Sequence, residues 1–310
     1  MQQLKKRWGD RTDGWRAISP DPLFAVMPHF MENRCDSQVM FDHEIDIGTL
    51  EKFVREQRRT GGLPELSVFH VLIAACVRMF GQYPCVNRFI CGRRLYARDR
   101  LVFAFTIKKS MSLEAPEALV KVEFDPADTL PQVYEKVLEA VRLNKAEDTR
   151  TDTGNLTRLL AACPGFILRG AVGVLKGLDY MGWLPRSLID LSPFHCSLYL
   201  TDVGSLGIGS VYHHLYNFGT CSMFCALGKK GRTLKKNDDN EIVYSKTLNL
   251  RFTVDERVTD GSYYARTFRD FIKLMRDPAQ LLTAPAEVPE DPGLSYRRRE
   301  EQVPEAPAAK

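Results

Sequence analysis

One segment restricts the fold more than any other: VFHVLIAACVRMFGQYP, which begins after Ser67 and ends at Pro84. Its apolar residues occupy nearly every side of a helix instead of a single stripe. A helix with no polar face must be covered by other layers of the structure. We therefore predict a helix from about Val68 to the residue before Pro84, at the centre of the core.

Strand patterns lie on both sides of this helix in the sequence. The most regular is Thr247–Val254, where apolar and polar residues alternate, as in a strand with one buried face. Together they predict an α+β fold, a two-layer sandwich in which a mixed sheet is flanked by helices. The other predicted strands are 39–45, 101–107, 118–124, 197–203 and 222–227, and the other predicted helices are 50–60, 131–141 and 261–277.

Composition excludes several classes of function. The 43 basic and 39 acidic residues leave a net charge of +4, too small a field to indicate nucleic acid. The 8 cysteines are scattered without zinc-site spacing, and GSLGIGS is not followed by a phosphate-binding helix, so we predict neither a metal nor a bound nucleotide. The N-terminal residues have no apolar stretch typical of a secretory signal, which favours a cytoplasmic location.

The ends of the chain differ from its middle. We predict an N-terminal arm over residues 1–20 and one domain over residues 21–284. Residues 285–310 are rich in Pro, Glu and Ala and contain few large apolar side chains. Such a segment cannot bury enough surface to offset its chain entropy, so we predict a disordered tail.

A heptad at the start of the last helix points to chemistry. Residues 255–261, DERVTDG, follow a strand and precede an amphipathic helix. They resemble the D-H-R-x-x-D-G motif of the 2-oxo acid dehydrogenase acyltransferases and, less closely, the H-H-x-x-x-D-G of chloramphenicol acetyltransferase. The segments MFDHEIDIGTLEKF, LYLTDVGSLGIGS and SMFCALGKK resemble further stretches of this superfamily, in the same order over about residues 20–280.

The resemblance implies a chloramphenicol acetyltransferase-like fold assembled as a homotrimer or a multiple of it, with the active site between subunits. It implies small-molecule substrates, namely a coenzyme A thioester and an acyl acceptor. Thr201 would donate a hydrogen bond to the oxyanion, and Asp260, before Gly261, would form a structural ion pair. The position of the catalytic histidine is occupied by Glu256.

This replacement weakens the base. A thiol with a pKa of about 8.5 transfers its proton uphill by about 2 units to a histidine but by about 4 units to an ordinary glutamate. The difference is about a hundredfold in the proton-transfer equilibrium. Burial, which favours the neutral carboxyl, would recover most of it, so Glu256 remains a candidate base.

Histidines and arginines near these motifs are further candidates. We consider that His213 or His214 stands beside Glu256 of a neighbouring subunit and shares its proton-handling role; the alternative is a surface or interface histidine pair with no chemistry. Three arginines are candidates for the ion pair with Asp260: Arg16 in the N-terminal arm, Arg34 and the adjacent Arg257. The sequence does not choose among them.

Residues 150–193 are longer than the corresponding stretch of the superfamily and largely apolar. Basic residues such as Arg169, Lys176 and Arg186 interrupt residues 165–191 too often for a membrane-spanning helix. This insertion could be a lid or tunnel wall for a long acyl group, a patch that rests on a membrane surface, or extra helices packed on the body or at the trimer contact.

Two functions remain open. The first is an acyltransferase that uses a thioester with atypical base chemistry at Glu256. The second is a catalytically inactive homologue that acts as an oligomeric binding scaffold. No lipoyl domain with its D-K-A lysine precedes the catalytic-type region, so we predict no lipoyl group of its own.

Overall fold

The computed structural model describes residues 4–19, 21–108, 117–146, 162–236 and 240–297. Its centre is a six-stranded mixed sheet in the order β2-β9-β8-β7-β5-β6. Strand β7 is parallel to both of its neighbours, and the remaining pairs are antiparallel. The strands are β2 (Gln38–Asp46), β5 (Leu101–Lys108), β6 (Glu117–Phe124), β7 (Leu198–Asp202), β8 (Met223–Lys236) and β9 (Ile242–Asp255).

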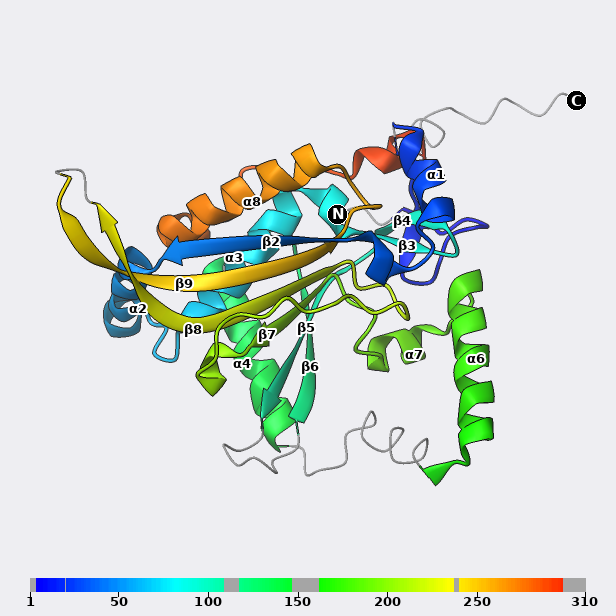
Figure 1. Cartoon of the computed structure of the whole chain (residues 1–310), viewed down its shortest axis with the longest axis horizontal. Helices are drawn as coiled ribbons and strands as arrows, with labels where there is room; N and C mark the ends of the chain where they lie inside the picture. The colour runs from blue at the N-terminus through cyan, green and yellow to red at the C-terminus, as the bar shows by residue number, and fades with distance from the viewer. Residues whose placement is uncertain (1–3, 20, 109–116, 147–161, 237–239, 298–310) are drawn as a thin grey trace, which may run out of the picture.

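Helices cover one face of this sheet (Figure 1). Helix α3 (Val68–Gln82) is buried along nearly its whole length, as its apolar sequence predicts, and packs between α4 and α8. Ser67 caps its first turn by accepting a hydrogen bond from the backbone N–H of His70. The other covering helices are α2 (Gly48–Thr60), α4 (Leu130–Ala146) and α8 (Gly261–Arg276). The predicted two-layer α+β architecture is confirmed.

Strands β8 and β9 run further than the sequence predicts. Residues 229–236, KKGRTLKK, contain a single large apolar residue, Leu234, and so give no one-sided strand pattern. Leu234 and Tyr244, opposite each other in the register, are 58% and 77% exposed. The hairpin thus projects from the body (Figure 1).

A second, three-stranded sheet gathers the N-terminal residues. Its order is β1-β4-β3, made of β1 (Gly14–Arg16), β4 (Arg94–Arg98) and β3 (Arg88–Cys91). Helix α1 (Leu23–Phe30) follows β1. The predicted N-terminal arm is therefore paired with the body over at least part of its length.

The insertion contains α6 (Gly165–Met181) and α7 (Arg186–Leu191), while residues 147–161 lie outside the described residues. Helix α6 stands beside the body with most of its surface exposed, including Phe166 and Val174 (Figure 1). Its last turn is anchored by a group of four buried side chains, which we call the arm cluster: Arg11, Asp13, Arg98 and Asp179. Within the described residues, no helix is both long and apolar enough to cross a membrane.

The C-terminal segment differs from the prediction of a tail that is disordered from residue 285. Asp291 is buried and forms an ion pair with Arg88. Its carboxylate also accepts a hydrogen bond from the backbone N–H of Gly293 and so caps the short turn at Pro292–Leu294. Arg297 is buried against Asp10, 2.7 Å away. These charged anchors, invisible in the composition, hold residues 285–297 on the body; residues 298–310 lie outside the described residues.

Candidate functional site

The junction between β9 and α8 is built around a buried carboxylate. Asp255, the last residue of β9, is fully buried. Its two oxygens accept hydrogen bonds from Arg257 Nε at 2.8 Å and from Nη2 at 2.7 Å, while Arg34 Nε lies 3.4 Å from Oδ2. We call Asp255, Arg34 and Arg257 the junction cluster. It fixes the backbone on both sides of residue 256.

Glu256 is half-buried at this junction. Its backbone N–H donates to the carbonyl of Ser37 at 2.9 Å, and the hydroxyl of Tyr264 donates to the carbonyl of Asp255 at 2.9 Å. Burial first, and then nearby acidic groups that include Asp255 and Glu256, raise the pKa of Tyr264. Glu256 is therefore held by a rigid backbone, with its side chain partly accessible.

Thr201 lies toward the opposite end of the sheet. It is half-buried in β7, in register with Ala226 of β8, which is in register with Arg251 of β9. Glu256 is five residues beyond Arg251, which corresponds to roughly 16 Å along the strand direction, besides two strand spacings across the sheet. Within one chain, Thr201 and Glu256 cannot contact the same reacting carbonyl.

Each of these two ends carries an open depression. At the Glu256 end, a cleft of about 400 Å³ separates α6 from the body; its lining includes Arg34, Arg93, Lys176, Asn217 and Arg257. At the Thr201 end, a groove of about 380 Å³ is lined by residues that include Asp202, Gly204, Ser205 and Lys229. Both volumes fall within the range of small-molecule sites.

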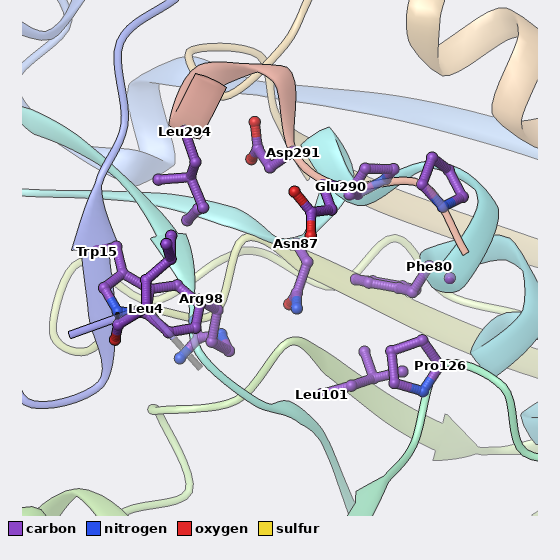
Figure 2. Close-up of a pocket in the computed structure, with 14 residues that line it drawn as sticks. Leu4, Trp15, Phe80, Asn87, Arg98, Leu101, Pro126, Glu290, Asp291 and Leu294 are labelled. Carbon is purple, nitrogen blue, oxygen red and sulfur yellow. Dashed lines mark hydrogen bonds between the residues drawn. The ribbon is translucent and has the colours of Figure 1, made fainter. Parts of the chain in front are cut away.

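A third pocket is remote from these residues. It lies where the N-terminal arm, α3 and the C-terminal segment meet (Figure 2), with Trp15 on one side and Glu290 and Leu294 above. Its volume of about 60 Å³ suits a few water molecules and not a thioester. We therefore do not assign the chemistry to it.

The fold is similar to those of solved acyltransferase structures. A probable dihydrolipoamide acetyltransferase from Listeria monocytogenes superposes with a TM-score of 0.52 and 13% identity, covering 86% of this chain and 95% of that one. A truncated catalytic core of the 2-oxoacid dehydrogenase multienzyme complex from Thermoplasma acidophilum gives 0.51 and 12%, covering 85% and 99%. This chain has the dihydrolipoamide acyltransferase fold.

Sequence comparison adds nothing to this result: no protein-family profile matches the chain, and no curated protein matches it either. At 12–13% identity the structural likeness establishes the acyltransferase fold, and the roles of individual residues have to be argued from this chain's own geometry.

In the described part of the chain, Asp260 does not form the ion pair that the family resemblance implies. Asp260 is exposed and caps α8, accepting from the N–H of Tyr263 at 2.9 Å, with Gly261 as the first helical residue. Among the described residues it forms no ion pair. The buried ion pair is made five residues earlier, by Asp255, with both Arg34 and Arg257.

Arg16, the third candidate partner of Asp260, belongs to β1 and is exposed. Its backbone N–H donates to Asp10 and its carbonyl accepts from Tyr296. Arg16 thus connects the N-terminal arm to the C-terminal segment and has no part in the junction.

The two histidines lie over the sheet face that the helices leave open. His213 stacks on Phe224, with ring centroids 3.9 Å apart, and His214 stacks on His213. Their Nδ1 atoms are hydrogen bonded to the backbone carbonyls of His214 and Leu215, and burial lowers the pKa of His213. Within the described part of a single chain, neither imidazole is hydrogen bonded to Glu256. Their relation to a neighbouring subunit stays a prediction.

Sequence reasoning did not single out Asp255 or the cleft-lining Lys176. A signal for Asp255 existed: an acidic residue at the end of a strand with four apolar inward residues, two positions before an arginine. No comparable signal marks Lys176, because its role depends on where α6 stands. Among the described residues, no group of His, Cys, Asp or Glu could hold a metal ion.

Proposed function

We propose that this protein is an acyltransferase whose active site forms between two copies of the chain, with Glu256 of one copy and Thr201 of the next. The observation that carries the proposal is the separation of the two residues. Both are half-buried, at opposite ends of one sheet, and the next residue of each lines a depression: Arg257 lines the cleft of about 400 Å³ and Asp202 the groove of about 380 Å³. A cyclic assembly brings opposite ends of identical subunits together.

In the proposed reaction, Glu256 removes the proton from the hydroxyl or thiol of the acceptor, which attacks the carbonyl of a coenzyme A thioester. Thr201 donates a hydrogen bond to the oxyanion of the tetrahedral intermediate. When the carbon–sulfur bond breaks, the leaving thiolate receives the proton held by Glu256. The junction cluster positions Glu256, and Lys229 beside the Thr201 groove is a suitable contact for coenzyme phosphates.

The first test is an assay of acyl transfer from a panel of acyl-coenzyme A donors, in which the free thiol of the released coenzyme A is measured. Glu256→Gln should lower the turnover by about 10²-fold or more, because a positioned base contributes at least that much. Thr201→Ala should cost about 10²-fold, and Thr201→Ser should keep most of the rate. Glu139→Gln, an exposed residue of α4, is the control. Equal rates for Glu256→Gln and Glu139→Gln would contradict the proposed role of Glu256 and favour the alternative function, an inactive binding scaffold.

Mixing the two inactive variants tests the shared site. When Glu256→Gln and Thr201→Ala chains are unfolded and refolded together as trimers, random association gives about a quarter of the sites an intact Glu256 and an intact Thr201. About a quarter of the wild-type rate should return. If both residues act within one chain, no activity returns, although each variant still assembles.

A further inference from the structure

The junction cluster has an unmatched positive charge. Arg34 and Arg257 are 4% and 2% exposed and share the single carboxylate of Asp255. Their other N–H groups donate to backbone carbonyls, including those of Tyr216 and Met31. In the described part of the chain, no other acidic side chain forms an ion pair with either arginine.

Neighbouring acidic groups are already committed. Glu32 forms its ion pair with Arg93, and Asp179 forms its ion pair with Arg11 and is hydrogen bonded to His195. Glu256 follows Asp255 in sequence but lies beyond ion-pair distance of both arginines. Burying an unpaired charge is costly, so the excess charge of the junction cluster indicates an absent anion.

The cleft beside α6 gives that anion a place. Both arginines line it, and the buried Nε atom of Arg34 lies 3.4 Å from Asp255 Oδ2 but makes no hydrogen bond. Lys176, exposed on α6, and Arg93 are the other basic side chains of the lining, and Glu32 and Asp179 are its acidic ones, which makes four basic groups and two acidic groups. Figure 1 shows α6 at the end of the molecule where β9 meets α8. The insertion therefore closes one side of a cleft whose net charge is positive.

We propose that this cleft binds an anionic group, a carboxylate or a phosphate, of the molecule on which the Glu256 site acts. The assignment to a substrate rests on the proposed acyltransferase function; the anion site itself does not. Lys176 would be a specificity-determining residue, because the rim of the cleft is the part of the site that the insertion supplies.

Binding is measured by calorimetry on the full chain, with inorganic phosphate and with acetate as separate probes, against chloride at equal ionic strength. Saturable binding of phosphate alone assigns a phosphate group, and binding of acetate assigns a carboxylate. If neither probe binds better than chloride, the proposal is overturned. Because no turnover is needed, an inactive protein that binds the anion separates this inference from the proposed function.

Two variants locate the site. Lys176→Gln should weaken anion binding by about threefold, the usual range for an exposed charge, and Lys176→Arg should restore it. Arg169→Gln is the matched control, an exposed basic residue on the same helix that does not line the cleft. Binding that Lys176→Gln and Arg169→Gln alter equally would place the anion elsewhere and overturn the proposal.

Asn217→Asp adds a negative charge inside the cleft with little change of shape. Asn217 Oδ1 accepts from the N–H of Cys35 at 3.1 Å, and an aspartate keeps that acceptor. The added charge should weaken binding by about tenfold, since it competes with the anion for the same arginines. Unchanged binding in a variant with an unchanged melting temperature would also contradict the proposed site.

Discussion

Two of the buried groups of arginine and aspartate in the described part of the chain, the arm cluster and the junction cluster, differ in their balance of charge. In the arm cluster, Arg11 and Arg98 face Asp13 and Asp179, so two positive charges meet two negative ones. Burial would raise the pKa of Asp179, but hydrogen bonding and charge interaction with His195, together with the Arg11 charge, lower it to about 2. The charges of this cluster balance within it, although Asp179 also lines the cleft that the junction cluster borders.

The junction cluster has two arginines and one aspartate, and it borders an open cleft. The comparison shows how a structural ion cluster differs from one with a binding role. A balanced cluster needs no further ligand and joins segments distant in sequence, here the N-terminal arm and the insertion. An unbalanced cluster is stable only with carbonyl dipoles around it and gains free energy from an anion.

The largest effect should come from Asp255→Asn. It removes the only carboxylate that, among the described residues, pairs with the buried guanidinium groups of Arg34 and Arg257, so the free energy of unfolding should fall by about 3–5 kcal/mol. Asp13→Asn should cost less, because Arg11 keeps Asp179 and only Arg98 loses its carboxylate partner, which lies 3.9 Å away. Denaturant unfolding of both variants measures the difference. A larger loss for Asp13→Asn would mean that the arm cluster, not the junction, depends most on its carboxylates.

Acid should act on the arm cluster through Asp179. Its pKa falls from 3.8 to about 2 on folding, so the folded state binds the proton less readily than the unfolded state. The resulting stability, about 2 kcal/mol, is present above about pH 4 and is lost as the pH falls toward 2. Unfolding measured across that range should be less dependent on pH in Asp179→Asn. An equally steep dependence in the variant would assign the acid loss to other carboxylates.

Most of the fold follows from the sequence because its strongest patterns concern burial. Helix α3 has no polar face and can only lie between layers, and β9 alternates because one face of the sheet meets helices. Hydrophobic patterns do not predict the outer half of the β8–β9 hairpin or residues 285–297. Their positions depend on cross-strand pairing and on ion pairs such as that of Asp291 with Arg88, which no periodicity records.

The candidate site is only partly readable in the sequence. The segment DERVTDG places Glu256 between a strand and a helix, and the segment LYLTDVGSLGIGS places Thr201 in a strand. Both placements depend only on residues that are close in sequence. The sequence does not tell which carboxylate of DERVTDG faces inward: Asp255 is buried, whereas Asp260 is exposed at the helix cap. Charge balance is a property of side chains from distant segments, so Arg34 and Lys176 acquire their meaning only in three dimensions.

The smallest expected effect makes the comparison sharper. Asn217→Asp supplies the junction cluster with a second negative charge from a partly solvated position, and the free energy of unfolding should rise by about 0.5 kcal/mol at low salt. The gain should shrink as salt screens the added charge. It should also shrink in phosphate buffer if phosphate is an anion that the cleft accepts, since a bound anion already supplies the missing charge.

Thermal unfolding of Asn217→Asp and the wild type at low and high salt, with chloride or phosphate, measures both effects. A loss of stability at low salt would show that the carbonyl dipoles around Arg34 and Arg257 already compensate the cluster in full, and the difference between the two clusters would then carry no information about a ligand.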